Sequence, residues 1–355
     1  MKPDLLPPDI KGRWEDIQKL PLIYLFYDDI SFDNIYCWFN CQIFDPALIP
    51  LDKFDKFVLS FHTEFLEHKI LFDFFSCNPD KEFLLISDWN HHENIFPSNV
   101  TTVTWITLHT QADYIIRTHG YCKSKNPSRR LSSLSYRHEF HKAAITSYIL
   151  SHTQPSDRIL SWWDVKRQPP YYLQPGYHID PAIAKYVLHP VFQNLDPIRL
   201  DEFDNSPLAN TQWRHLAYLD CVFNLTNESV YNSNSEIGRL PGPYITDKTW
   251  KVLLSGTGLI PVGQTGTIEH LKSLGMFFDY QIDLSFDSLV HDDERILGIF
   301  STIDSILERP IYRLQKDIQE SNAYNINHIV TKRFSKKCQD HNSQQRDKIV
   351  RWIKK

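Results

Sequence analysis

The sequence predicts an α/β fold made of two domains with mostly parallel sheets. Short apolar runs of strand length recur along the chain, and segments with helical spacing lie between them, which is the pattern of alternating strands and helices. The chain has 355 residues, which is long for one hydrophobic core and sufficient for two. Its hydrophobic content of 42% is typical of a folded globular protein.

The first domain is predicted to span residues 1–130. A segment with helical spacing lies at Glu64–Phe75, and the polar, basic stretch Cys122–Arg130 is the candidate linker to the next domain. The predicted strands are the apolar runs Pro21–Phe26, Lys56–Phe61, Phe83–Ser87 and Val103–Leu108.

The second domain is predicted to span residues 131–310. Residues 165–215 are rich in Pro, Tyr and Asp and are expected to be irregular. Regular elements are predicted at Leu131–Ser135 (strand), His138–Ser151 (helix), Ile159–Trp163 (strand) and, in alternation, from Cys221 to about Leu307.

A basic helical tail is predicted over residues 311–355. It holds eleven basic and four acidic side chains, so its charge of +7 leaves −12 for the rest of a chain whose total is −5. Three interpretations stay open: an exposed helix that closes the fold, an amphipathic anchor on an anionic membrane surface, or a contact with the phosphate backbone of DNA. The total charge gives no overall attraction to nucleic acid.

The cysteines and the N-terminus predict a cytoplasmic protein. The six cysteines are scattered without the close pairs of a zinc site, and we expect them to be buried and inert in a reducing compartment. Residues 1–18 contain prolines and charges where a signal peptide has an apolar run. No stretch approaches the ~20 apolar residues of a transmembrane helix.

A predicted strand at Cys221–Leu225 leads to candidate ligand-binding residues. Glu228 follows this strand, where a carboxylate can bind ribose hydroxyls, although a capping or loop acid is the simpler interpretation of Glu228 alone. Thr246 and Asp247 then begin a helix. Its free backbone N–H groups, with Lys248 beside them, suit a diphosphate, and a solvated lysine is the simpler alternative.

A second strand and helix follow at once. After Gly256, which can end the first helix, the strand Leu259–Val262 leads to a turn with Gly263 and Gly266, and Thr267 is predicted to cap the next helix. Two glycines in this place let the backbone approach a phosphate, although such a pair is more often only a turn. The two adjacent units together predict a nucleotide-diphosphate crevice.

The chain reads VFNLTNES at 222–229, PYITDKTWKVLLSGTGLIPVGQTGTIEHLKSLG at 243–275 and LGMFFDYQIDLSFDSL at 274–289. These runs resemble the donor-binding segment of α-1,3-fucosyltransferase-like enzymes and, more closely, that of phage and bacterial glycosyltransferases. The similarity covers about a fifth of the chain. It implies GT-B architecture, in which two Rossmann-like domains face a central cleft and the C-terminal domain binds a nucleoside-diphosphate sugar.

The resemblance also implies which residues bind this donor. Asp247 stands where the family usually has Glu, and the loop before Tyr244 is longer than usual. A weaker similarity at LSSLSYRHEFHK, residues 131–142, implies cationic ligands of the pyrophosphate, with a basic surface helix as the alternative. The resemblance implies Glu228, Tyr244 and Lys248 at the nucleotide sugar and Arg137 with His141 or Lys142 at the pyrophosphate. The helix start and the turn described above add Thr246, Asp247, Gly263 and Gly266 to the candidate donor site.

The catalytic base of such an enzyme is expected at the end of a strand in the first domain. It would be a carboxylate or a histidine that deprotonates the acceptor hydroxyl. Asp28-Asp29 and His62–Glu64 both qualify, but the segment 88–93 is the densest cluster. The candidates in that cluster are Asp88, His92 and Glu93.

No metal site is predicted, and no cofactor is expected to be obligatory. No apolar run ends in the Asp-x-Asp that holds a divalent ion in metal-dependent transferases, and Asp283 and Asp287 are interpreted mainly as turn and capping residues. Lys, Arg and helix dipoles would neutralise the leaving diphosphate instead. A less favoured alternative is a metallohydrolase that uses His91, His92, His138 and His141.

The sequence therefore predicts the transfer of a sugar from a nucleoside-diphosphate sugar to a hydroxyl of a glycan or another cellular acceptor. Two further alternatives stay open. One is a phage-type enzyme that glycosylates a modified DNA base, and the other is a non-catalytic nucleotide-binding module.

Overall fold

The computed structural model describes residues 34–40, 44–61, 68–87, 95–105, 112–113, 115–117, 120–121, 126–135, 139–162, 180–188, 216–228, 231 and 242–355. The chain folds into two compact units. Unit 1 comprises Met1–His109, Asn232–Tyr244 and Ser335–Lys355, and unit 2 comprises Thr110–Tyr231 and Ile245–Phe334.

The two units cut across the predicted sections of the chain. Arg129 and Arg130, at the end of the predicted linker, lie in a strand of unit 2. The predicted tail, residues 311–355, contributes to both units. The assignment of an acceptor domain and a donor domain stays a prediction.

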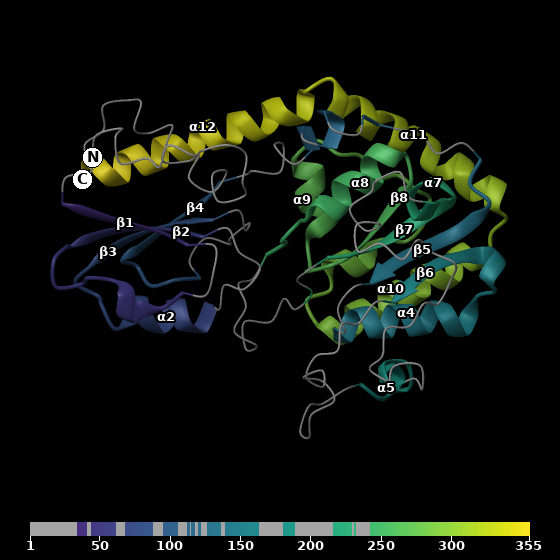
Figure 1. Cartoon of the computed structure of the whole chain (residues 1–355), viewed down its shortest axis with the longest axis horizontal. Coiled ribbons are helices and arrows are strands. Elements are labelled where there is room, and N and C mark those ends of the chain that lie inside the picture. Colours follow the sequence, from purple (N-terminus) through teal and green to yellow (C-terminus); the bar gives the residue numbers. More distant parts are fainter. Residues whose placement is uncertain are drawn as a thin grey trace. The chain divides into compact units, whose positions relative to one another are not determined.

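Unit 1 contains a parallel sheet of four strands in the order β1-β2-β3-β4 (Figure 1). In its register, Val58 lies between Cys37 and Leu84. The strands are β1 (Ile35–Asn40), β2 (Lys56–Phe61), β3 (Glu82–Ser87) and β4 (Val100–Thr104), with the 3-10 helix η2 (Pro46–Leu48) and the α-helix α2 (His68–Ser76) between them in sequence.

An aromatic core covers one face of this sheet. Phe57 and Phe83 stack with their ring centroids 5.3 Å apart, and Phe74 and Phe75 of α2 approach Phe83 at 5.4 and 4.8 Å. Phe57, Phe75 and Phe83 are fully buried. Because successive side chains of a strand point to opposite faces, the residues between them belong to a second core.

Helix α12 (Arg333–Lys354) supplies the cover of this second face. Parallel strands joined in sequence order by right-handed crossovers place their connections on one face, so the other face needs cover from elsewhere in the chain. Ile349 and Trp352 of α12 pack there against Val58 and Leu84. The apolar face of α12 therefore closes the fold, as the first interpretation of the basic tail predicts.

Unit 2 contains a second four-stranded parallel sheet, in the order β6-β5-β7-β8. The chain moves outward from β5 to β6, returns across β5 to β7, and continues outward to β8. The strand order therefore reverses between β5 and β7, which makes this pair a topological switch point. The strands are β5 (Arg129–Ser135), β6 (Arg158–Trp162), β7 (Cys221–Asn227) and β8 (Gly258–Val262).

Helices lie on both faces of this sheet, α4 and α10 on one and α8 and α11 on the other (Figure 1). On the first face, Tyr148 of α4 stacks on Phe300 of α10 with ring centroids 3.8 Å apart. The helices of unit 2 are α4 (Phe140–His152), α5 (Pro181–Val187), α7 (Leu216–Leu219), α8 (Asp247–Ser255), α9 (Thr267–Ser273), α10 (Asp292–Leu307) and α11 (Ile311–Val330), with the 3-10 helices η3 (Pro155–Asp157) and η6 (Ser285–Ser288).

The α/β class and the parallel sheets are confirmed. The strand β2 has the predicted bounds, and α8 begins after the N-cap Thr246 and ends at Gly256, whose φ of 73° is left-handed. The aromatic strand β1 was not predicted, and β4 begins at Val100 instead of Val103. The predicted strand Pro21–Phe26 lies outside the described residues.

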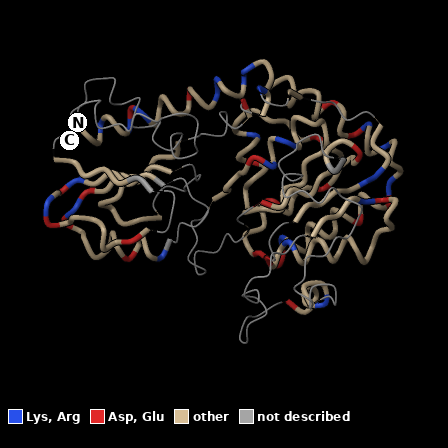
Figure 2. The backbone as a smooth tube through the Cα atoms, viewed as in Figure 1, with Lys and Arg blue, Asp and Glu red and all other residues tan. Residues whose placement is uncertain are grey.

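The structure bears on two further predictions, one about the burial of the cysteines and one about membrane-spanning segments. Among the described cysteines, Cys221 and Cys338 are buried, Cys37 is half-buried and Cys77 is exposed, so the expectation of buried thiols was wrong for Cys77. No helix in the described ranges is long and apolar enough to cross a membrane. Figure 2 shows basic and acidic positions interspersed along α11 and α12.

Candidate functional site

Polar side chains line the two strands that meet at the switch point of unit 2. Buried parallel strands are usually continuous apolar runs, but β5 and β7 carry buried Ser and Asn residues. Asn224 donates to Ser132 Oγ at 2.7 Å and accepts from Thr226 Oγ1 at 2.8 Å. This chain of hydrogen bonds crosses from one central strand to the other and pairs the amide of Asn224 inside the sheet.

Asn227 is the last residue of β7 and extends this series of polar side chains to the carboxyl edge of the sheet. Its Nδ2 donates to Ser133 Oγ at 2.8 Å, to Ser135 Oγ at 3.1 Å and to the carbonyl of Leu134 at 3.2 Å. Its Oδ1 is buried and accepts no hydrogen bond from the described residues. A buried acceptor without a donor is costly, which sets Asn227 Oδ1 apart from the other polar groups at the switch point.

The carboxylate of Glu228 lies directly after β7 and is fully buried. One oxygen accepts from Thr246 N at 3.1 Å and Thr246 Oγ1 at 2.6 Å, and the other accepts from Thr249 Oγ1 at 2.5 Å. Burial raises the pKa of Glu228, and nearby Lys248 and these hydrogen bonds act against that rise. Glu228 thus holds the start of α8 through the hydrogen bonds that it accepts from Thr246 and Thr249.

The start of α8 combines its predicted residues with this internal anion. Thr246 is the N-cap, and its hydroxyl accepts from the backbone N–H of Lys248 at 3.4 Å. Asp247 pairs with Lys251 one turn later, with 2.5 Å between Oδ2 and Nζ. The positive end of the helix dipole favours an anion at this start, and the group that its backbone N–H contacts in this structure is the carboxyl of Glu228.

The start of α9 follows the same rule with a different carboxylate. Asp287 accepts from the backbone N–H groups of Ile268 at 2.9 Å and Glu269 at 3.4 Å. Burial raises the pKa of Asp287 to about 6, against the lowering effect of these donors. The prediction that Asp287 caps a helix is confirmed.

The two glycines of the turn before α9 allow close packing at the carboxyl edge of the sheet. Gly266 has a φ of 77°, takes the N-cap position predicted for Thr267, and donates its N–H to the carbonyl of Asp287 at 2.7 Å. A Cβ added to Gly263 would lie 3.3 Å from the side chain of Glu228. Both glycines therefore have structural reasons that need no phosphate.

The start of α4 differs from the other two because its N-cap residue, Glu139, does not cap it with its side chain. The Glu139 carboxylate instead lies 2.8 Å from Nζ of the buried Lys142 and 3.7 Å from Nε2 of the buried His141. His141 Nε2 also lies 3.3 Å from the carbonyl of Glu228. Its ring stacks on Tyr231 with centroids 4.7 Å apart.

Arg295 of α10 is a structural centre of this edge that sequence reasoning did not select. It is 1% exposed and donates to the carbonyls of Tyr231 at 2.7 Å, Gly263 at 3.1 Å and Leu289 at 2.8 Å, and it pairs with Asp292 at 2.6 Å. It therefore ties the segments after β7 and β8 together. The only sequence signal was an arginine one turn into a helix with an acidic first turn.

The other predicted site residues fall elsewhere. Tyr244 is half-buried and belongs to unit 1. Within the described ranges, no group of three or more His, Cys, Asp or Glu side chains could hold a metal ion. The candidates Asp88, His92, Glu93 and Arg137 lie outside the described residues.

The arrangement can bind an anionic, hydroxyl-bearing ligand at the carboxyl ends of β5 and β7. Lys142 and Lys248 are cations near this edge, and Asn227 Oδ1 is an acceptor. No protein-family model, curated protein or solved structure matches this chain.

Proposed function

We propose that this protein is a glycosyltransferase that uses a nucleoside-diphosphate sugar and binds its nucleotide at the carboxyl edge of the sheet in unit 2. One observation carries the proposal. The strand order reverses between β5 and β7, and buried polar groups from both strands converge at that point. In open α/β sheets, ligands bind in the crevice outside the carboxyl ends of the strands at such a reversal.

The start of α4 is the best candidate for the diphosphate. It follows β5, the first strand at the reversal, and α4 is thirteen residues long, so its dipole is well developed. His141 and Lys142 lie in its first turn. Backbone N–H groups at the starts of α8 and α9 already donate to Glu228 and Asp287, which makes these starts poor sites for a second acceptor. At the start of α4, the Glu139 carboxylate pairs with the side chain of Lys142 and does not cap the helix.

The orphan acceptor suits the nucleoside part of the donor. Asn227 Oδ1 needs a hydrogen-bond donor, and a ribose hydroxyl or the N–H of a base supplies one, whereas a phosphate does not. Lys248, beside the same edge, adds a positive charge that a diphosphate would share with Lys142. We expect no obligatory metal, because these cations and the α4 dipole can neutralise the leaving diphosphate.

The transfer step rests on the resemblance of residues 222–289 to glycosyltransferase donor segments, together with the presence of a second α/β unit. In the proposed GT-B arrangement, unit 1 would supply the base that deprotonates the acceptor hydroxyl, with Asp88, His92 and Glu93 as candidates. The acceptor would be a glycan or another cellular hydroxyl compound, with a modified DNA base as the alternative.

The first test is thermal unfolding with a panel of nucleoside diphosphates and their sugars, with and without EDTA. A ligand at about 100 times its Kd should stabilise the folded state by roughly 2.7 kcal/mol. We expect a selective shift that EDTA does not change, and Lys248→Ala should reduce it. Lys316→Ala, an exposed lysine of α11 in the same unit, is the matched control and should keep the full shift.

Activity is then measured as transfer of sugar to added acceptors and as release of nucleoside diphosphate. Binding without hydrolysis or transfer would favour the non-catalytic nucleotide-binding module. The absence of a shift with every diphosphate would refute the transferase proposal.

A further inference from the structure

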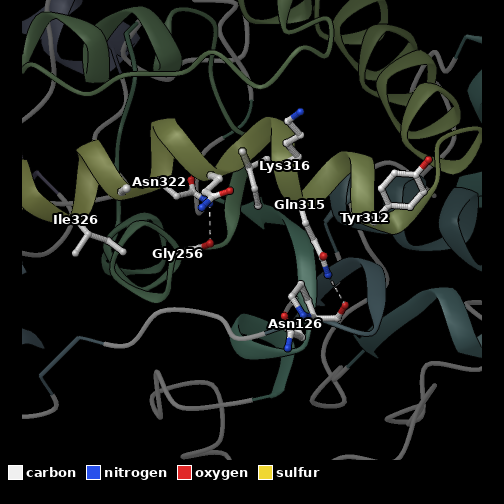
Figure 3. A pocket seen from close by; sticks show the side chains of 11 residues that line it. Asn126, Gly256, Tyr312, Gln315, Lys316, Asn322 and Ile326 are labelled. Atoms are coloured by element: carbon white, nitrogen blue, oxygen red, sulfur yellow. Dashed lines mark hydrogen bonds between the residues drawn. The ribbon is translucent and has the colours of Figure 1, made fainter.

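A cavity in unit 2 lies at the edge of the sheet opposite to the proposed nucleotide site. Its volume is about 410 Å³, and Figure 3 shows it between α11 and the segments that lead into β5 and β8. Asn126 and Pro127 precede β5, and Gly256 precedes β8, so the cavity is at the amino edge of the sheet. It is therefore separate from the proposed nucleotide site at the carboxyl edge.

The cavity is an elongated groove along one face of α11. Its lining runs from Tyr312 to Ile326, fourteen residues along the helix, which spans about 21 Å at 1.5 Å per residue. The buried side chains of Ile318 and Ile326 form an apolar floor. A ligand that fills the groove is therefore extended, with one apolar surface.

Amide side chains provide most of the polar lining. Two of them are held by hydrogen bonds: Gln315 Nε2 donates to the carbonyl of Pro127 at 2.9 Å, and Asn322 Nδ2 donates to that of Gly256 at 2.6 Å (Figure 3). Asn322 Oδ1 also accepts from the Tyr280 hydroxyl at 3.4 Å. Gln319 is exposed on the same face of α11. Each amide offers both donors and acceptors, which is what hydroxyl groups need.

The charges around the groove favour a neutral ligand. Among the described residues that line it, none is acidic, and Lys316 is the one basic side chain. The carboxyl end of α8 reaches the groove at Gly256, and the negative end of its dipole disfavours an anion there. A phosphorylated or otherwise multiply charged ligand would therefore lack compensation.

We propose that this groove binds a short neutral oligosaccharide. Sugar hydroxyls can pair with the amides of Asn126, Gln315 and Gln319, while the C–H face of the sugar rings covers the apolar floor. The groove lies at the edge opposite the nucleotide site, so the proposal does not rest on the transfer reaction.

The test is saturation-transfer NMR and calorimetry on the full chain with neutral di- to tetrasaccharides of glucose, galactose, mannose and N-acetylglucosamine. We expect at least one series to bind. Gln319→Ala should weaken that binding by tenfold or more, because it removes an exposed amide without disturbing the helix. Asn126→Gly should do the same, since glycine accepts the φ of 55° at this position.

Glu320→Ala is the matched control, because Glu320 is exposed on α11 but does not line the groove. It should bind the saccharide as the native chain does, and so should Lys248→Ala and the native chain saturated with a nucleoside diphosphate. Three results would overturn the proposal: no neutral saccharide binds, binding is unchanged in Gln319→Ala and Asn126→Gly, or nucleotide displaces the saccharide. A failure of nucleotide binding with intact saccharide binding would count against the proposed function alone.

Discussion

The two parallel sheets of this protein have the same number of strands but different strand orders. A chain of buried Ser and Asn side chains lies where the order of the second sheet reverses. In unit 1 the strands follow the order β1-β2-β3-β4 without a reversal, and β2 and β3 each bury a single serine, Ser60 and Ser87. In unit 2 the order β6-β5-β7-β8 reverses at the centre, and the two central strands bury a chain of Ser and Asn side chains.

The two strand orders differ in how the faces of the sheet are covered. The progressive sheet of unit 1 leaves one face uncovered by its own connections, and α12 brings an apolar face from the end of the chain to close it. The reversing sheet of unit 2 is covered on both faces by its own helices, and it has the strand reversal at which open α/β sheets bind ligands. The first sheet therefore depends on a distant helix for stability, and the second holds the site proposed for the nucleotide.

The largest expected effect is the loss of stability when the packing of α12 against the sheet of unit 1 is weakened. Trp352→Ala removes a side chain that is 5% exposed from the core of the second face, and such truncations cost about 3–5 kcal/mol. We expect a lower denaturant midpoint for the transition of unit 1, followed by circular dichroism. Arg351→Ala, an exposed neighbour on the same helix, should change the stability by less than about 0.5 kcal/mol. An unchanged midpoint for Trp352→Ala would show that α12 does not close unit 1.

A second comparison lies within unit 2, between helix starts that hold internal carboxylates and the start of α4. The pKa of Asp287 is raised from 3.8 to about 6, so the folded state binds its proton more tightly than the unfolded state. This contribution to stability is fully present below pH 4 and is lost as the pH rises through about 6. The loss amounts to about 3 kcal/mol at most, from about 1.4 kcal/mol per pKa unit.

Asp287→Asn tests this pH dependence because it keeps an acceptor at the start of α9 and removes the titrating group. Chemical denaturation at pH 4, 5, 6 and 7 should show that the native chain loses stability relative to the variant as the pH rises. The readout is the difference in slope, since the variant also has a constant offset from the weaker neutral cap. Parallel profiles would mean that Asp287 titrates near its ordinary pKa in the folded chain.

Local signals in the sequence predicted the fold well where they were complete. Thr246 and Gly256 mark both ends of α8, because a hydroxyl N-cap and a left-handed glycine act within one turn. The strand β1 was missed because its sequence, IYCWFN, was interpreted only as aromatic-rich chain. The cover of unit 1 by α12 joins residues some 300 positions apart, as in the hydrogen bond from Lys56 to the carbonyl of Trp352, which no local pattern encodes.

The sequence predicted the chemistry of the candidate site but not which residues contact one another within it. The preference of the α8 and α9 starts for anions follows from their sequence, yet the groups that they contact are the carboxyls of Glu228, eighteen residues before its partner Thr246, and Asp287, nineteen residues after Ile268. Sequence alone does not show that a carboxylate folds back to fill a helix start. Arg295 escaped for the same reason, because its importance lies in the distant carbonyls that it joins.

The prediction with the smallest expected effect tests whether the turn before α9 is only structural or binds a phosphate. Gly266→Ala places a side chain at a φ of 77°, where nothing lies within 4 Å of the added Cβ, so its cost is the backbone strain of about 1–2 kcal/mol. Gly120→Ala is matched in both respects, with a φ of 73° and open space. Both variants should lose similar stability in thermal unfolding. If the turn before α9 only packs the edge, both should also keep the full stabilisation by the nucleoside diphosphate that binds best. A loss of that stabilisation in Gly266→Ala alone would move the diphosphate from the start of α4 to the start of α9.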